Sequence, residues 1–502
     1  MRRVWIEGCL GVALFLVGSW ISGCATLSPG PRRENFGPLF LYSEDEAKEG
    51  RESDVLGPFF LHRKDTEETD LAFRPFFYWR EKPGEYTFLE YLYPFGKYKR
   101  TDREVESYFI PFYLSRYDLT QKDQQKKESG FFPVFWGETE TGESYGGLFP
   151  IYGNLKKRFG RDELNFFLWP IYSDSSLEGN KTTSLFWPFF SYTTGGGREG
   201  FKVWPLYGHE QKENSYEKTF FAWPIFHFEE RYLYTDDPTK IDMVFPFYVS
   251  SANSNRVSRS ILWPFFTYTH NSSEAYTQWD FPWPFIQWAE GENKSILRIF
   301  PLYGHKHWED RDRGYILWPV YWYVHQEDDT YKKEINRFFV LSKDQTEVWK
   351  NEGEQSRKLR VWPFFYFRQE REGGVYFYYP SLIPVDYEGY ERNWIPLLTL
   401  YEYRRNPAGE SESKFLWGCY VHRQSVDREL YELSFFLTYY TAEDLFYFSL
   451  LKGLLEYRVD GSKHALRLFY WPRPIEWPSD LAHSEAESAM EGEVQTLLIK
   501  VD

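Results

Sequence analysis

The apolar residues of this chain gather in short runs that recur at a nearly constant interval. Each run has an aliphatic or aromatic residue, then Trp-Pro or a close variant, then two large apolar residues, and a polar stretch follows. Residues 182–209, TTSLFWPFFSYTTGGGREGFKVWPLYGH, hold two copies. From Pro38 to Pro319 the motif prolines lie 17 to 22 residues apart, and degenerate copies continue to Trp471-Pro472. This regularity predicts a repeat protein of about 20–24 units.

The runs have the composition of β-strands. They are short, rich in aromatic and β-branched residues and bounded by Gly, Asn, Asp and Ser clusters, whereas a helix would not tolerate a proline about every nineteen residues. We therefore predict an all-β fold: a large antiparallel meander of about 20–24 strands, one per repeat, barrel-like or curled on itself. Residues on both sides of each run are apolar, so both faces of the sheet should be covered.

The Trp-Pro pairs are predicted to be packing and curvature elements within the strands. Proline lacks an amide donor, so its recurrence at one register predicts a row of bends or bulges across the sheet. We expect the tryptophans to form a ladder of rings at equivalent buried positions. The clearest copies are Trp187-Pro188, Trp204-Pro205, Trp263-Pro264, Trp318-Pro319 and Trp362-Pro363.

The N-terminus resembles the leader of a bacterial lipoprotein. Two arginines precede an apolar core, and Ile21-Ser22-Gly23-Cys24 resembles a lipobox. The resemblance implies cleavage between Gly23 and Cys24 and an N-terminal lipid, palmitate included, on Cys24. Ala25 stands in place of the Asp that retains such lipoproteins at the inner membrane of enteric bacteria, which implies the outer membrane. An uncleaved N-terminal anchor helix is the alternative.

These features divide the chain into four predicted parts: a signal peptide (1–23), a tether (24–35), an aromatic-repeat β domain (36–476) and a polar tail (477–502). Aromatic residues make up 21% of the chain, which argues against disorder because such a chain can bury a large core. Once Cys24 is lipidated, Cys419 is alone, so we predict no internal disulfide.

No catalytic constellation stands out. Residues 195–200 match the G-x-G-x-x-G pattern, but one repeat strand precedes them and another follows, so we interpret them as a hairpin loop. His305 and His307 could share one strand face, but no third metal ligand lies at a suitable spacing. We therefore predict no catalytic residue, no metal and no cofactor. The net charge of −15 argues against nucleic acid, which requires clustered lysine and arginine.

These observations favour a non-catalytic, lipid-anchored envelope protein that acts as a β scaffold or a surface interaction module, and not an enzyme. Its expected location is the outer membrane of a Gram-negative-type bacterium, with an unidentified envelope protein or glycan as a partner. The chain resembles bacterial lipoproteins with WPFF- or WPLY-type aromatic β repeats; the resemblance covers residues 36–476 and assigns no functional site.

Two alternatives stay open. The first is an outer-membrane β-barrel or pore, because about nineteen residues per strand is close to the spacing in such barrels. Against it, the aromatic residues lie at the centre of the runs and not in two girdles. The second is a carbohydrate- or lipid-binding repeat protein.

Overall fold

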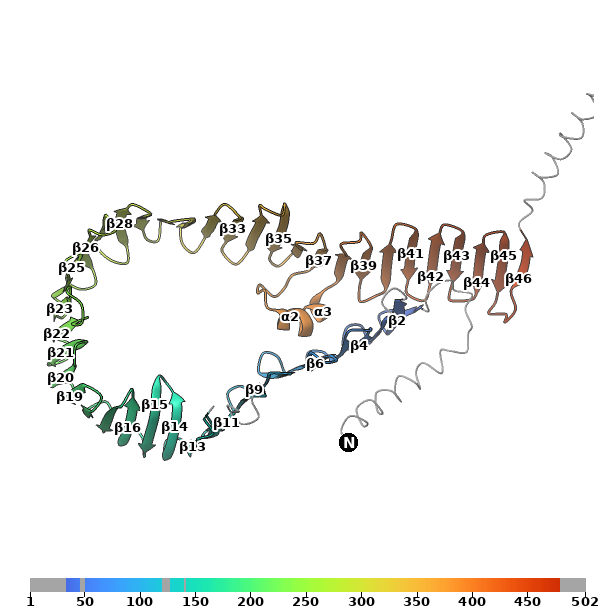
Figure 1. Ribbon diagram of the computed structural model, residues 1–502. Coiled ribbons are helices and arrows are strands. Elements are labelled where there is room, and N and C mark those ends of the chain that lie inside the picture. Colours follow the sequence, from blue (N-terminus) through green and yellow to red (C-terminus); the bar gives the residue numbers. More distant parts are fainter. Residues whose placement is uncertain (1–32, 46–49, 120–126, 140, 479–502) are drawn as a thin grey trace, which may run out of the picture. The chain divides into compact units, whose positions relative to one another are not determined.

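A computed structural model describes residues 33–45, 50–119, 127–139 and 141–478. These residues form 46 strands in one sheet, together with two short helices (Figure 1). Successive strands pair antiparallel, so the predicted all-β antiparallel meander is confirmed. Among the described strands, pairing runs from each strand to the next over β1–β5, β6–β35 and β36–β46, and it does not join β1 to β46.

The described residues form two compact units. Unit 1 comprises the chain up to Arg74, Phe364–Leu382 and the chain from Glu391; unit 2 comprises Pro75–Pro363 and Ile383–Tyr390. The strands of unit 1 are β1 (Arg33–Phe36), β2 (Phe40–Asp45), β3 (Gly50–Val55), β4 (Phe60–Lys64), β5 (Thr69–Phe73), β36 (Phe365–Gln369), β37 (Val375–Tyr379), β38 (Tyr401–Arg405), β39 (Ser411–Phe415), β40 (Tyr420–Gln424), β41 (Arg428–Leu433), β42 (Leu437–Ala442), β43 (Leu445–Leu450), β44 (Leu455–Asp460), β45 (Lys463–Leu468) and β46 (Ile475–Pro478).

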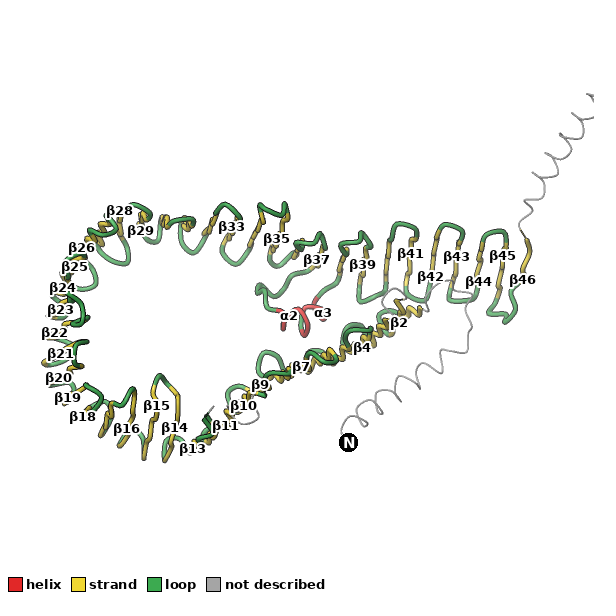
Figure 2. The backbone as a smooth tube through the Cα atoms, in the orientation of Figure 1, coloured by secondary structure: helices red, strands yellow, loops and turns green. Residues whose placement is uncertain are grey.

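Unit 2 is a meander in which each strand bonds to the next (Figure 2). Its strands are β6 (Phe77–Lys82), β7 (Tyr86–Tyr91), β8 (Gly96–Thr101), β9 (Glu104–Phe109), β10 (Tyr113–Asp118), β11 (Lys127–Phe131), β12 (Val134–Glu138), β13 (Ser144–Leu148), β14 (Tyr152–Arg158), β15 (Arg161–Phe167), β16 (Tyr172–Leu177), β17 (Asn180–Leu185), β18 (Phe190–Thr194), β19 (Arg198–Val203), β20 (Tyr207–Lys212), β21 (Tyr216–Phe221), β22 (Phe226–Arg231), β23 (Thr239–Val244), β24 (Tyr248–Ala252), β25 (Arg256–Ile261), β26 (Phe266–Asn271), β27 (Tyr276–Asp280), β28 (Ile286–Gly291), β29 (Lys294–Ile299), β30 (Tyr303–Trp308), β31 (Arg311–Ile316), β32 (Tyr321–Glu327), β33 (Tyr331–Phe338), β34 (Ser342–Trp349) and β35 (Glu354–Val361).

The predicted number of strands is wrong, because each repeat contains two strands and not one. The Trp-Pro pair does not lie inside a strand: Trp187-Pro188 belongs to the turn between β17 and β18. The Trp187-Pro188 peptide bond is cis, and the amide of Phe189 donates to the carbonyl of Phe186 at 2.8 Å. This arrangement is that of a type VI turn, which reverses the chain at the centre of the apolar run.

Two kinds of turn alternate along unit 2. From β7 to β34, every turn that joins an odd-numbered strand to the next strand is built from apolar residues, such as 186–189 and 262–265. The turns that join even-numbered strands to the next are mostly polar and include Gly195–Gly197 and Asn253–Asn255. In a meander alternate turns lie at the same edge, so the sheet has one apolar edge and one polar edge. The expectation of two apolar faces is therefore corrected to one apolar edge.

Aromatic rings lie over glycines next to the apolar edge. In β20, Gly208 is paired with Phe220 of β21, and a Cβ atom at Gly208 would overlap the Phe220 ring. Gly304 of β30 stands in the same relation to Tyr315 of β31. These glycines provide the space that the large rings of the neighbouring strands require.

Unit 1 contains two layers of strands that face one another. The N-terminal layer, β1–β4, lies against strands of the C-terminal layer that begins at β38, as the bonds from Arg33 to Glu432 and from Lys414 to Glu52 demonstrate. Leu41, Leu61 and Val421 are buried, and Leu41 lies against Gly418 of the other layer. Each is the second residue of an even-numbered strand, directly after the turn that joins it to the preceding odd-numbered strand. The apolar contact therefore lies near these turns.

A short helical insertion replaces the apolar turn between β37 and β38. It contains α2 (Glu388–Asn393), which spans the boundary between the two units, and α3 (Ile395–Leu398). Within unit 1, Ile395 packs in a buried cluster with Tyr366 and Tyr378.

The first and last described strands extend past two predicted segment boundaries. The structure begins β1 at Arg33, inside the predicted tether (24–35), because Arg33 and Asn35 both donate to Glu432 of β41. At the other end β46 reaches Pro478, inside the predicted tail. The predicted signal peptide, Gly23 and Cys24 lie outside the described residues.

The two layers approach closely at a pair of turns. A Cβ atom at Gly37 would overlap the backbone of Gly418 and Cys419, and Gly418 itself has φ +94°. Ser434 donates from Oγ to the carbonyl of Gly37 at 2.6 Å. The degenerate copy Trp417-Gly418 therefore has glycine where other copies have proline because only glycine tolerates this φ readily.

We expect Gly37→Ala to destabilise unit 1 by about 1–3 kcal/mol, because its methyl group forces two backbones apart. The matched control is Gly374→Ala, whose nearest neighbour is the flexible end of Glu370, and it should cost less than about 0.5 kcal/mol. Modification of the partly buried Cys419 thiol in rising urea measures opening of the layers. Equal thiol reactivity in both variants would contradict this account of the contact.

Candidate functional site

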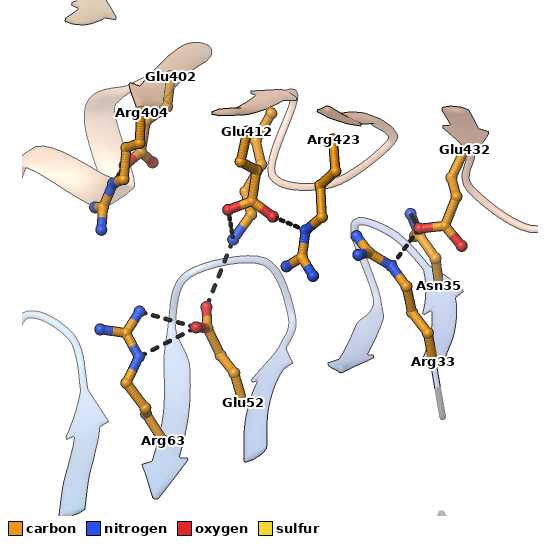
Figure 3. Close-up of polar contacts among 10 residues, drawn as sticks. Arg33, Asn35, Glu52, Arg63, Glu402, Arg404, Glu412, Arg423 and Glu432 are labelled. Carbon is orange, nitrogen blue, oxygen red and sulfur yellow. Dashed lines mark hydrogen bonds and ion pairs between the residues drawn. The ribbon is translucent and has the colours of Figure 1, made fainter. Parts of the chain in front are cut away.

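Charged side chains fill much of the space between the two layers of unit 1. Because side chains alternate along a strand, every second residue faces the other layer. Figure 3 shows these side chains projecting toward one another from both layers. We call them the charged clasp, which comprises Arg33 of β1, Glu52 of β3, Arg63 of β4, Glu412 and Lys414 of β39, Arg423 of β40 and Glu432 of β41.

Two cations of the charged clasp bridge the layers. Arg33 Nε lies 2.6 Å from Glu432, and the side chains of this pair are only 9% and 2% exposed. Lys414 Nζ lies 3.5 Å from Glu52 of the opposite layer and 3.4 Å from Glu412 of its own strand. The clasp therefore joins residues almost 400 positions apart in the chain.

The two carboxylates that contact Lys414 each have a second cation beside them. Arg63 Nη2 lies 2.9 Å from Glu52, and Arg423 Nε lies 2.5 Å from Glu412. Burial alone would raise the pKa of Glu52, but Lys414 and Arg63 outweigh burial and lower that pKa to about 2. The pKa of Glu412 is lowered for the same reason by Arg423 and Lys414, against the effect of burial.

Asp54 is the exception in this region. Burial, followed by the negative charge of Glu52 on the same face of β3, raises the pKa of Asp54 to about 7, although Lys414 opposes the shift. The two carboxyl groups compete for the same cations, and Glu52 has the closer partners. Asp54, which lies beside the charged clasp, therefore changes its charge near neutral pH.

A cavity of about 790 Å³ opens beside the charged clasp, toward the polar turns of both layers. Its walls carry cations and carboxylates in similar numbers, and these include most of the clasp. Besides clasp residues, the lining comprises Glu34, Ser43, Glu44, Gly50, Arg51, Lys64, Asp65, Glu68, Arg404, Asn406, Glu410, Ser411, Gln424, Ser425, Arg428, Glu429, Leu430, Thr438, Tyr440, Tyr447 and Lys452.

The arrangement of the clasp suits a structural contact better than a reaction. Its carboxylates are held by lysine and arginine, so a low pKa keeps Glu52 and Glu412 charged and unable to act as acids near neutral pH. Removing one member of such a buried pair leaves an uncompensated charge, which strongly destabilises a protein. The clasp thus holds the first strands of the chain against β38–β41.

Asp54→Asn is expected to change how the stability of unit 1 depends on pH. Between about pH 4 and 7 the folded chain retains a proton on Asp54 that the unfolded chain has released, so stability falls as pH rises through this window. The variant should lack this fall and be more stable than the parent at pH 8, by up to a few kcal/mol. The urea midpoint for protease cleavage within residues 33–74, measured at pH 5 and pH 8, tests this.

The matched control is Glu67→Gln, which changes an exposed carboxylate in the next polar turn. It should retain the parent's pH dependence. A parental fall in stability from pH 5 to pH 8 that persists in Asp54→Asn would show that another group is responsible.

The second candidate site is the apolar edge of unit 2, which we call the aromatic edge. It comprises the turns that join odd-numbered strands to the next strand from β7 to β34, with the strand residue on each side of every turn. Large side chains in these turns are exposed: Leu206 is 67% exposed, Phe247 64% and Leu302 56%. A half-exposed aromatic ring leaves roughly 100 Å² in solvent. About six such rings exceed the largest apolar patch of a typical soluble monomer, roughly 300–600 Å².

The strand residues beside the turns form an apolar row on one face of the sheet. Tyr172, Leu185, Phe190, Val203 and Tyr207 are successive cross-strand partners on five neighbouring strands. Paired residues point to the same face, so these side chains line up next to the turns. The row continues through Phe221, Phe226, Val244, Tyr248, Ile261 and Phe266.

The backbone of the aromatic turns is hydrogen-bonded from one turn to the next. In the turn at 186–189, the amide of Phe186 donates to the carbonyl of Ile171 at 2.6 Å. The amide of Trp187 donates to the carbonyl of Pro170 at 2.8 Å, and Pro188 has no amide hydrogen. Equivalent bonds join the turns at 222–225 and 317–320 to the turns before them.

The aromatic rings of neighbouring turns also contact one another, but they are not buried. The ring centroids of Trp169 and Trp187 are 5.8 Å apart, and those of Trp204 and Trp223 are 5.7 Å apart. Trp187, Trp263 and Trp318 are 50%, 45% and 51% exposed, so the expectation of buried positions is wrong. The reason is that the turn projects beyond the strands that would cover its rings. Trp204 and Trp362 are partly exposed.

All five Trp-Pro pairs singled out in the sequence lie in turns and not in strands. The turns at Pro188, Pro205, Pro264 and Pro319 belong to the aromatic edge. Pro363 follows β35 at the end of unit 2.

We expect Trp204→Ala to reduce the stability of unit 2 by about 2 kcal/mol, because its ring contacts Phe189 at 5.6 Å and Trp223 at 5.7 Å. Trp263→Ala should cost about 1 kcal/mol, because its ring is nearly half exposed. Leu206→Ala, in the same turn as Trp204, is the control and should stay within about 0.5 kcal/mol. Urea unfolding followed by circular dichroism ranks the three. A loss of stability of about 3–5 kcal/mol at both tryptophans would contradict this account and support a ladder of buried rings.

The other motifs examined in the sequence are structural. Gly195–Gly197 form the turn between β18 and β19, so the hairpin interpretation of GGGREG is confirmed. His307 Nδ1 lies 2.9 Å from Asp312, and His305 Nδ1 lies 2.9 Å from the hydroxyl of Tyr323. The part of the chain that the structure describes contains no group of three or more His, Cys, Asp or Glu side chains placed to hold a metal ion.

Most of the charged clasp has no local sign in the sequence. Arg33 and Glu432 lie in ordinary charged stretches, and only the fold brings them together. A partial signal existed in the alternating charges of Glu52 and Asp54 on β3, and of Glu412 and Lys414 on β39, since alternation places them on one face.

Comparisons with known proteins provide no family for this chain. No protein-family model matches it, and no curated protein matches it. Among solved structures, the chain is similar to apo AztD from Citrobacter koseri, with 11% sequence identity over 69% of this chain and 92% of that chain. The TM-score is 0.11, so the likeness carries no argument. Within the described residues, no helix is both long and apolar enough to cross a membrane.

Proposed function

We propose that the protein is a non-catalytic, lipid-anchored β scaffold of a bacterial envelope, located at the outer membrane. The observation that carries the proposal is the repetition of one turn and one set of turn-to-turn hydrogen bonds along unit 2. Such repetition builds an extended surface of equivalent positions, whereas catalysis requires different groups that converge on one point.

The strand lengths favour the scaffold over the pore. Strands of unit 2 contain five to eight residues, whereas a transmembrane β-strand requires about 9–11. The distribution of apolar residues also favours the scaffold, because they gather at one edge and not in a band between two aromatic girdles.

A ligand-binding repeat protein is the second candidate. The half exposure of Trp187, Trp263 and Trp318 favours it, because rings that serve packing alone are normally covered. The two candidates share the same body and differ in what the aromatic edge contacts.

Mass spectrometry of the N-terminal peptide from membrane-extracted protein tests the anchor. We expect a chain that begins at an acylated Cys24. Cys24→Ala should block processing and leave residues 1–23 attached, which provides the control. A native peptide that contains Met1, or an unmodified Cys24, would contradict the proposed anchor.

A further inference from the structure

The turns of the aromatic edge lack charge along its whole length, and among the strand residues beside them Asp280 is a buried carboxylate that accepts hydrogen bonds from Gln278 and Gln287. From β7 to β34, the turns that form the aromatic edge contain no charged residue, whereas the polar turns at the opposite edge carry charges such as Glu213 and Glu309. Strand β20, of six residues, separates Leu206 at the aromatic edge from Glu213 at the polar edge. Strands rise about 3.3 Å per residue, so the two edges lie roughly 20 Å apart. The surface therefore changes from apolar to charged over that distance.

The backbone of the aromatic edge is compatible with an environment that contains no water. An amide that enters hydrocarbon without an acceptor costs several kcal/mol. In the turn at 186–189, the amides of Phe186, Trp187 and Phe189 all have carbonyl acceptors, and Pro188 has no amide hydrogen. The amides of such a turn therefore keep their acceptors when the turn leaves water.

The chemistry of the side chains selects a lipid surface over a second copy of the chain. Trp and Tyr concentrate at membrane–water interfaces, where an apolar ring meets a polar layer. The turns project beyond the strands, and the apolar row lies beside them on one face, so a covering partner must surround an edge. A fluid bilayer does so, whereas a rigid copy covers one side. The net charge of −15 favours zwitterionic over anionic lipid.

The next step rests on the proposed function, in which Cys24 carries a lipid and so lies at a membrane. Residues 25–32 separate Cys24 from Arg33, and so short a segment spans at most roughly 30 Å. The first strand would then begin within that distance of a bilayer.

We propose that the aromatic edge of unit 2 lies in the interfacial layer of a lipid bilayer, as a second membrane contact independent of the N-terminal lipid. The polar edge stays in water. The contact is apolar in origin, so added salt does not weaken it.

The position of each edge is tested with two single-cysteine variants in a Cys419→Ser background. Leu206→Cys and Glu213→Cys place an environment-sensitive fluorophore at the two ends of β20 in the lipidated protein. In vesicles of phosphatidylcholine and phosphatidylethanolamine, the label at 206 should shift to the blue and be quenched by lipids with a nitroxide on the acyl chain. The label at 213 should do neither. Equal behaviour of the two labels would overturn the proposal.

Binding without the anchor is tested with the mature chain that starts at residue 24 and carries Cys24→Ser. It should float with the same vesicles, equally well at low and high salt. Leu206→Asp, Phe247→Asp and Leu302→Asp together should reduce partition roughly a hundredfold or more. The control combines Phe159→Asp and Tyr234→Asp, which change rings 82% and 70% exposed in the polar turns, and it should float as the parent does.

The outcomes separate this proposal from the proposed anchor. A parent chain that does not float, or that floats as well with the triple change, overturns the membrane contact even if Cys24 is acylated. If the parent chain does not float but forms oligomers, and the triple change dissociates them, the edge contacts a second copy of the chain instead. Flotation that the triple change abolishes supports the contact even if Cys24 proves unmodified. Circular dichroism of each variant confirms that it is folded.

Discussion

The hydrogen bonds between successive aromatic turns are the interaction on which unit 2 depends. A polar turn can satisfy some of its amides with its own side chains: Asn253 Oδ1 accepts from the amides of Asn255 and Arg256. An apolar turn has no such groups, so its amides must find carbonyls elsewhere. In unit 2 they find them in the turn before, as Trp187 does at Pro170. An apolar edge is therefore stable only as a continuous series of turns, which explains why the motif recurs with such regularity.

Unit 1 is built from similar strands, but charged side chains and not apolar ones dominate the contact between its two layers of strands. Where its layers meet, the inner faces carry buried ion pairs such as Arg33–Glu432, while large side chains such as Leu39 stay 64% exposed in the turns. Charges at these inner faces depart from the pattern of an ordinary soluble protein, in which charges lie outside. A charged interior demands matched partners, so it selects one alignment of the two layers. Gly37 and Gly418 then allow those layers to approach at the turns.

Sequence reasoning succeeded where the signal is local and repeated. The spacing from Pro38 to Pro319 and the turn residues between the runs were sufficient to predict an antiparallel all-β meander. The strand number failed because an apolar run looks like one buried strand, whereas Pro188 reverses the chain in the middle of it. The burial of Trp263 failed for the same reason. The charged clasp was beyond prediction, since no local pattern relates Arg33 to a residue 399 positions away.

The strict alternation of turns has a consequence for how such a chain can change length in evolution. Deleting or duplicating a whole hairpin, such as β17 with β18, keeps every later turn at its own edge. Losing a single strand exchanges the two edges for all the strands that follow, so that aromatic turns would appear among charged ones. Gains and losses should therefore come in pairs of strands. The near-constant interval of about nineteen residues, which equals one hairpin with both its turns, is what descent by duplication of that unit would leave.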